Sequence, residues 1–266
     1  MNSRLCWTFA ITSLALFAFT LDRLVVAIAL PAIRTDLGAG VAGLEWTVNA
    51  YTLSFAVLLL TGGALGDRFG RRRMFTIGVA VFTAGSAAAA LAPTIGALVA
   101  ARAVQGVGGA IFTPLTLTML SAVTPPGRRG TVLGAWGGIG GLGAALGPLA
   151  GGVLAGSVGW RAIFWLNVPL GLVLMPLARV RLAETYGPRR RLDLAGVALG
   201  SAGLSGVVWA VIRAGAAGWR YWRCSCAGRC GRPPRCCRCA SSAAGCSPPA
   251  RWPAWPCTPR CSARCS

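Results

Sequence analysis

The chain has 266 residues, of which 55% are hydrophobic and only 12% are charged. Soluble domains carry about twice that share of charged residues, so the composition excludes an ordinary soluble protein and favours a membrane protein. The formal net charge of +20 would otherwise indicate nucleic-acid binding, but the Arg residues are clustered between long apolar runs or gathered in the tail. We therefore expect a lipid bilayer, and not nucleic acid, as the partner.

Seven apolar runs have roughly the length of a membrane-spanning helix, about 17 to 25 residues. In chain order they are Trp7–Leu30, Trp46–Leu65, Met74–Leu91, Ile95–Val123, Thr131–Val158, Ala162–Leu177 and Leu194–Ile212. The first run is too long for the apolar region of a usual signal peptide, so we interpret it as a span. The sequence thus predicts an all-α multi-pass membrane protein with a six-helix half (residues 1–180), a cytoplasmic basic loop (181–191) and a seventh span (192–213).

Arginine is concentrated in every second connection between the predicted spans. It precedes the first span, and it recurs in DRFGRRR (67–73), in PPGRRG (125–130) and between spans six and seven. Short loops rich in Arg remain on the cytoplasmic side of a membrane. This alternation predicts a multi-pass protein of the plasma membrane with its N-terminus in the cytoplasm.

Three ionisable residues lie inside the apolar runs: Asp22, Arg23 and Arg102. Each costs roughly 2.5 to 3.5 kcal/mol to insert, so all three are candidate functional residues. Arg102 is followed by Gln105, Gly106 and Gly109 at i+3, i+4 and i+7, which places all four on one helix face. The glycines on this face would let a neighbouring helix approach closely. A purely structural Arg102, bonded to backbone carbonyls, is the alternative.

Asp22 is a candidate proton-binding residue, because burial disfavours the charged form of a carboxyl group. The alternatives are a local pair with Arg23 and a position at the membrane interface. Adjacent side chains point about 100° apart on a helix, so the sequence does not assure a tight pair.

The segment GGALGDRFGRRR (62–73) closes the second span and opens the third. Its glycines permit a tight turn, its Arg cluster would anchor the cytoplasmic face, and Asp67 is expected to cap the next helix. A generic anchoring loop would need the Arg residues but not Gly and Asp at fixed offsets. The spacing is therefore the informative part of the segment.

Several motifs in this order resemble the major facilitator superfamily. GALGDRFGRRR (63–73) looks like its signature loop, LVAARAVQGVGGA (98–110) like its span-four motif, and GLGAALGPLAGG (141–152) like its span-five antiporter motif. The residues that match the loop and span-five motifs are Gly63, Leu65, Asp67, Arg68, Gly70, Arg71, Gly143, Gly147, Pro148, Gly151 and Gly152. LDRLVVAIALP (21–31), WRAIFWLNVPLG (160–171) and RLDLAGVALG (191–200) are similar to motifs of the fourteen-span drug:proton antiporters.

This resemblance implies export of hydrophobic or cationic drugs against proton movement, by alternating access of two six-helix halves. It implies that Asp22 is the coupling or cation-attracting carboxylate, that Arg102 and Gln105 are its partners, and that Asp67 and Arg71 belong to a cytoplasmic gate. The proton gradient would replace any cofactor, and protons and a small molecule would be the ligands. The chain departs from the family pattern at Leu24, where Thr is usual.

Enzymatic activity is not expected, because the chain has no His, no nucleophile elbow and no phosphate-binding loop.

The glycines of span five are expected to serve helix packing, since small residues let membrane helices pack closely. Gly143, Gly147 and Gly151 form one row, and Gly140, Ala144, Pro148 and Gly152 form a second row beside it. The two rows predict a flat packing face with a bend at Pro148.

Residues 214–266 are rich in Cys, Arg and Pro and have no apolar run. We interpret this segment as a disordered tail translated out of frame in a GC-rich gene, in the place where a second six-helix half would follow as packing partner. A metal cluster, a disulfide-rich outer domain and a basic nucleic-acid-binding arm are the alternatives for the tail. For the chain, the alternatives to a drug exporter are a truncated membrane fragment that does not transport and an exporter of another small metabolite.

Overall fold

The computed structural model describes residues 3–187 together with residues 203 and 206. In this part the chain forms six α-helices and one 3-10 turn. They are α1 (Ser3–Leu37), α2 (Val41–Phe69), α3 (Arg71–Ala90), α4 (Ile95–Val123), η1 (Pro126–Arg128), α5 (Arg129–Ser157) and α6 (Arg161–Arg181). All six helices are long and apolar enough to cross a membrane. The predicted all-α membrane fold is confirmed for its first six spans, whereas the seventh span and the Cys-rich tail lie outside the described residues.

The helices extend past the apolar runs that predicted them. α1 continues through Pro31 to Leu37, and α2 begins at Val41. Apolar composition marks the part of a helix that the hydrocarbon core covers, whereas backbone hydrogen bonding continues into the interface. The breaks fall where the backbone takes a positive φ, at Gly38 (59°) after α1 and at Gly70 (98°) between α2 and α3.

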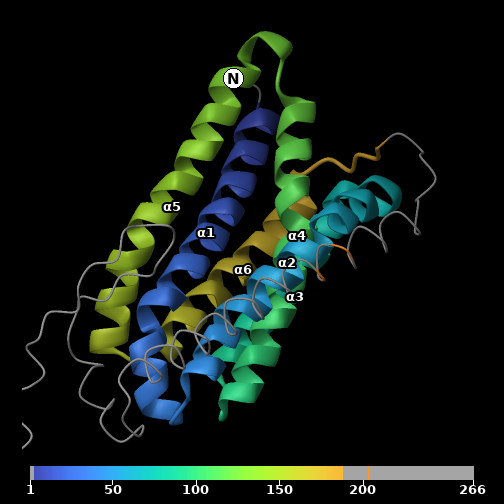
Figure 1. Ribbon diagram of the computed structural model, residues 1–266. Coiled ribbons are helices and arrows are strands. Elements are labelled where there is room, and N and C mark those ends of the chain that lie inside the picture. The colour runs from blue at the N-terminus through green and yellow to red at the C-terminus, as the bar shows by residue number, and fades with distance from the viewer. Residues whose placement is uncertain (1–2, 188–202, 204–205, 207–266) are drawn as a thin grey trace, which may run out of the picture. The chain divides into compact units, whose positions relative to one another are not determined.

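Neighbours in the bundle are often far apart in the sequence. α1 lies beside α5, α2 lies beside α4, and α3 packs against both α4 and α6 (Figure 1). The helices differ in how much of their apolar surface this packing covers. In the most apolar window of α1, α3 and α4, 50–61% of residues are buried, against 17% in α2 and 22% in α5. α2 and α5 therefore expose most of their apolar length within the described bundle.

An aromatic cluster occupies the middle of the bundle. Phe112 of α4 makes edge-to-face contacts with Phe19 of α1 at 5.9 Å and with Phe75 and Phe82 of α3 at 6.1 and 5.7 Å between ring centroids. Edge-to-face pairs are worth about 0.5 to 1.5 kcal/mol beyond the area they bury. These contacts hold α1, α3 and α4 in the arrangement that positions the polar residues described next.

Candidate functional site

Five polar side chains from four helices meet inside the apolar bundle. They are Asp22 of α1, Ser86 of α3, Arg102 and Gln105 of α4, and Asn167 of α6. Each of the five residues is at most 3% exposed. Buried polar groups are costly unless they are hydrogen-bonded, so the stability of the site depends on the hydrogen bonds among these side chains.

Asp22 accepts hydrogen bonds from three donors. Arg102 donates from Nη1 to Oδ2 at 2.6 Å, and Asn167 donates from Nδ2 to Oδ1 at 2.7 Å. Gln105 donates to Oδ1 from 3.4 Å. The carboxylate therefore has a charged partner on one oxygen and amide partners on the other, as a buried anion requires.

Gln105 connects the ion pair to α3. Its Oε1 accepts from Arg102 Nη1 at 2.9 Å, and its Nε2 donates to Ser86 Oγ at 2.5 Å. Tyr51 of α2 covers the other side of the guanidinium, with the Arg102 Cζ atom 4.1 Å from the ring centroid. Within the described part of the chain, Tyr51 Oη and Arg102 Nε have no hydrogen-bond partner. The cluster thus keeps an unused donor and an unused hydroxyl beside its ion pair.

The structure decides between the alternatives that the sequence left open. Asp22 pairs with Arg102, 80 positions away in the chain, and not with its neighbour Arg23. Arg102 donates hydrogen bonds to the side chains of Asp22 and Gln105. The alternative, in which Arg102 bonds to backbone carbonyls, is therefore not what the structure shows. Sequence reasoning missed Asn167, Ser86 and Tyr51. Asn167 is the only amide side chain in the apolar run of α6, and that isolation was the available signal.

The face of α4 that carries Arg102 packs tightly, as its spacing indicated. A Cβ added at Gly106 would lie 2.5 Å from the Tyr51 carbonyl oxygen of α2, and one at Gly109 would lie 2.7 Å from the Phe19 ring. Real Cβ atoms do not approach so closely. These two glycines therefore bring α1 and α2 against the charged face of α4.

The connection between α2 and α3 holds a second ion pair. Asp67 Oδ1 accepts from Arg71 Nη2 at 2.8 Å and from Arg71 Nε at 2.9 Å. The Arg68 side chain is exposed and lies over the Phe69 ring. A Cβ at Gly63 would make only an ordinary van der Waals contact with Pro114, at 3.8 Å. The structure thus places Asp67 and Arg71 together and leaves Gly63 and Arg68 outside the pair.

The expectation that Asp67 caps the next helix is wrong. Asp67 lies within α2, and Gly70 is the N-cap of α3 without a side-chain capping bond. Glu184, which follows α6, takes that role: its Oε1 accepts from the backbone N–H of Arg72 at 2.9 Å. A carboxylate from a distant segment satisfies an orphan N–H as well as a local cap does, and no local sequence pattern predicts it.

The segment after α6 is bonded to the same connection by its backbone. The N–H of Arg71 donates to the Thr185 carbonyl at 2.9 Å, and the N–H of Gly187 donates to the Asp67 carbonyl at 3.1 Å. The Arg72 guanidinium also reaches Glu184 Oε2 at 3.4 Å. The end of α6 and the start of α3 therefore lie at one end of the bundle and are held together there.

On α5 the first glycine row faces α1. A Cβ at Gly147 would lie 2.9 Å from Leu24 Cβ, and one at Gly151 would lie 3.1 Å from the Val25 carbonyl. Gly143 would meet Thr20 in the same way. Leu24, the departure from the family pattern, thus packs against the glycine row.

The second row does not complete a flat packing face. α5 is continuous through Pro148, and Pro148 and Gly152 are both exposed in the described bundle. A Cβ at Gly152 would meet nothing within 4 Å. Only the first row therefore packs against another described helix along its whole length.

A third ion pair lies at the C-terminal end of α1, beyond the apolar run that ends at Leu30. Asp36 Oδ2 accepts from Arg161 Nη1 at 2.5 Å and from Trp160 Nε1 at 3.1 Å. The bond from Arg161, and then the one from Trp160, lower the pKa of the Asp36 carboxyl. This pair is exposed, in contrast to the buried pair of Asp22 and Arg102.

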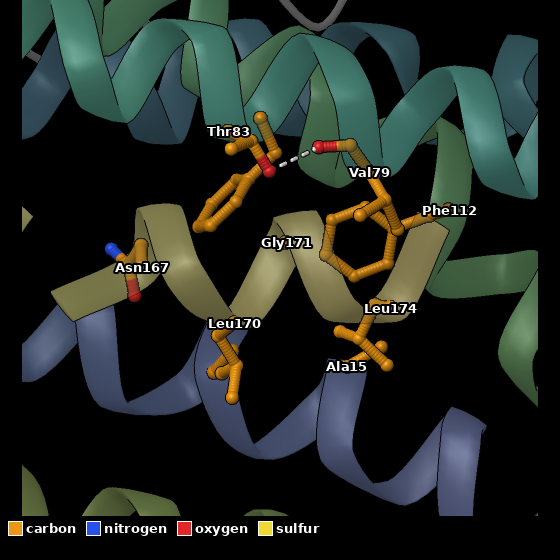
Figure 2. Close-up of a pocket in the computed structure, with 10 residues that line it drawn as sticks. Ala15, Val79, Thr83, Phe112, Asn167, Leu170, Gly171 and Leu174 are labelled. Carbon is orange, nitrogen blue, oxygen red and sulfur yellow. Dashed lines mark hydrogen bonds between the residues drawn. The ribbon is translucent and has the colours of Figure 1, made fainter. Parts of the chain in front are cut away.

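The cavity next to the polar cluster is too small for a substrate. It lies between α1, α3, α4 and α6, with Asn167 at one end and Gly171 facing Thr83 of α3 (Figure 2). Its volume of about 10 Å³ has room for about one water molecule. Across the described residues no group of three or more His, Cys, Asp or Glu side chains could hold a metal ion.

Comparison with known proteins identifies this architecture. The family model of the Major Facilitator Superfamily matches residues 12–230. The tetracenomycin C resistance and export protein of Streptomyces glaucescens is 42% identical over 201 residues, which cover 75% of this chain and 37% of that protein. The multidrug resistance protein Stp of Mycobacterium tuberculosis is 38% identical over 221 residues, covering 82% of this chain and 41% of the relative.

Solved structures agree on the fold. The POT family transporter PepTSo superimposes with a TM-score of 0.63 at 15% identity, over 72% of this chain and 40% of its own. A D-xylose-proton symporter gives a TM-score of 0.56 at 18% identity, over 76% and 53%. The chain thus spans about two fifths of the length of the curated relatives it matches.

Proposed function

Because this chain belongs to the Major Facilitator Superfamily, we propose that it acts within a proton-coupled exporter of drugs and other small molecules that works by alternating access. Relatives named as antibiotic resistance and export proteins support export as the direction of transport. The observation that carries the proposal is the buried ion pair of Asp22 and Arg102, set among helices apolar enough to span a membrane.

Protonation of Asp22 would change the net charge of the Asp22–Arg102 pair from zero to +1. A proton on the carboxyl group removes its charge and leaves Arg102 buried without a counter-ion, which costs about 3 to 5 kcal/mol. Switching a two-state equilibrium from 1:99 to 99:1 needs about 5.5 kcal/mol. One proton on Asp22 therefore supplies most of the free energy needed to favour a second arrangement of α1 against α4.

In this proposal Gln105 and Asn167 keep the carboxyl group positioned when the charge is lost. Both amides have bonds to Asp22, and Gln105 also bonds to Arg102 and Ser86. Asp67 and Arg71 would act at the cytoplasmic end, where their connection is bonded to the segment after α6. No enzymatic step and no cofactor is proposed, because the proton gradient supplies the energy.

We place the chain in the plasma membrane with its N-terminus in the cytoplasm. The start of α1, the connection of α2 and α3, and the end of α6 share one end of the bundle: Arg181 lies 4.5 Å from the Trp7 ring, and Arg72 bonds to the Arg179 carbonyl at 3.3 Å. This Arg-rich end supports a cytoplasmic location. The exposed apolar lengths of α2 and α5 support a second helical half as their packing partner.

The test uses inside-out membrane vesicles from a bacterial host that lacks its own efflux pumps. A proton gradient is imposed, and uptake of ethidium, carboxyfluorescein and tetramethylrhodamine methyl ester is compared between the chain and empty vesicles. Asp22→Asn should abolish gradient-driven uptake, whereas Asp36→Asn, which breaks the exposed pair at the other end of α1, should leave it unchanged. Unchanged coupling in Asp22→Asn would reject the role of Asp22.

One alternative is a membrane fragment that inserts but does not transport. In the same vesicles, uptake equal to that of empty vesicles for all three dyes would support this alternative.

A further inference from the structure

Arg23 is a cation at membrane depth that the coupling site does not use. It follows Asp22 on α1, but its side chain is exposed and turns toward α2. Its Cζ atom lies 5.9 Å from the ring centroids of Phe19 and of Phe55, within the range of a cation–π contact. Among residues 3–187 no carboxylate forms an ion pair with it.

The position of Arg23 calls for an anionic partner. It precedes Leu30, the end of the apolar run, by seven positions, which places it about 10 Å inside that end at 1.5 Å per residue. Charges at this depth almost always face a bundle interior or a water-filled path and have a partner there. The guanidinium of Arg is also the side chain best shaped for planar, bidentate binding of a carboxylate.

The acidic residues of the described chain do not supply that partner. Four of them already hold an Arg elsewhere: Asp22, Asp36, Asp67 and Glu184. Glu45 lies ten positions before Phe55 on α2, about 15 Å along the helix axis. Asp22 is also fully buried and receives three donors, so it presents no free charge to a cationic substrate. The accessible charge at this site is positive.

A shallow, open depression lies on the same side of α1, nearer its C-terminal end. It is lined by Leu30, Pro31, Arg34, Thr35 and Leu44, and not by Arg23 or Phe55. Leu30 and Arg34 follow Arg23 at i+7 and i+11, so the three share one helix face. That face carries two cations, and the depression opens onto it.

We propose that Arg23, together with Phe55, binds the anionic group of an aromatic substrate. The guanidinium would hold a carboxylate or phenolate through charge-assisted hydrogen bonds, while the partly buried Phe55 ring contacts the aromatic part of the ligand. The proposal rests on the proposed export function and narrows its substrate class to aromatic anions. It replaces the expectation, implied by the family resemblance, that Asp22 attracts a cationic drug.

Two dyes with the same xanthene ring system and opposite charge test the proposal. Carboxyfluorescein is anionic, and tetramethylrhodamine methyl ester is cationic. The purified full chain is placed in nanodiscs of phosphatidylcholine, which has no net charge, and the binding of each dye is followed by fluorescence anisotropy without a proton gradient. Arg4→Gln, which removes an exposed charge from the other end of α1, is the matched control.

The unmodified chain should bind carboxyfluorescein more tightly than the cationic dye. Arg23→Gln should weaken carboxyfluorescein binding about tenfold, the loss expected for a charge-assisted hydrogen bond, and should leave the cationic dye within about twofold. Arg23→Lys should lie between the two, because an ammonium group lacks the planar fork. Arg4→Gln should leave both dyes unchanged.

Tighter binding of the cationic dye overturns the proposal, as does an Arg23→Gln variant that changes both dyes equally or neither. Failure of carboxyfluorescein to bind also overturns it and leaves an acidic side chain of another polypeptide as the counter-charge. If circular dichroism shows that Arg23→Gln is unfolded, Phe55→Leu gives the decisive result: weaker binding of the anionic dye supports the proposal, and unchanged binding rejects it. Because no gradient is present, a failure of proton coupling in vesicles does not affect this result.

Discussion

Replacing Arg102 by Met should destabilise the bundle strongly although the two side chains are similar in length. The substitution removes the 2.6 Å bond from a carboxylate that is fully buried, and it leaves Asp22 with amide donors at 2.7 and 3.4 Å. An uncompensated buried charge costs about 3 to 5 kcal/mol. That is a large part of the roughly 5 to 15 kcal/mol by which proteins are stable, and it lowers the folding equilibrium constant by roughly two to four powers of ten.

A double-mutant cycle separates the ion pair from other effects of the substitution. Asp22→Asn, Arg102→Met and the double variant are unfolded with SDS in mixed micelles, and helix content is followed by circular dichroism. We expect a coupling energy of about 3 kcal/mol between the two sites, because the double variant buries no unpaired charge. The same cycle on Asp36 and Arg161, whose side chains are 45% and 41% exposed, should give a smaller coupling because water screens this pair. A coupling below about 0.5 kcal/mol at the buried pair would contradict the cost assigned to an unpaired charge there.

Three further predictions concern packing, capping and pH. Gly147→Leu should lower the thermal stability of the chain in detergent, because its Cβ would meet α1, whereas Gly152→Leu should not; equal effects would contradict the packing of the first glycine row against α1. Glu184→Ala, which removes the acceptor, should speed hydrogen exchange at the Arg72 amide, and an unchanged exchange rate would exclude Glu184 as the cap. The pKa of Asp36 is lowered in the folded state, so its pair stabilises the fold at neutral pH and this contribution is lost as pH falls through that lowered pKa. Asp36→Asn should therefore reduce the acid sensitivity of unfolding, and unchanged sensitivity would refute this assignment.

Periodicity predicted the parts of the site that lie on one helix. Gln105, Gly106 and Gly109 share a face with Arg102 because i+3, i+4 and i+7 fall together on any α-helix, and the bundle uses that face as expected. The six spans were predictable for a similar reason, since only long apolar runs can cross a bilayer. Both inferences need no knowledge of tertiary contacts.

The parts of the site that depend on tertiary contacts were not predictable in this way. Asp22 had Arg23 as an adjacent candidate partner and Arg102 as a distant one, and the choice depends on how α1 is rotated against α4. Glu184 reaches the start of α3 across 112 positions, so no local capping pattern reveals it. Asn167 carried a signal of its own, a polar amide in an apolar run, but its partner depends on the packing of α6 against α1.

Proton coupling through Asp22 can be measured by applying a dye gradient and following proton movement. Vesicles that contain the chain and a trapped pH indicator receive an outside pulse of a transported dye, with no proton gradient imposed. We predict proton movement opposite to the dye in the unmodified chain and in Asp36→Asn, and none in Asp22→Asn. Proton movement that persists in Asp22→Asn at the unmodified rate would contradict the proposal that this carboxylate couples protons to export.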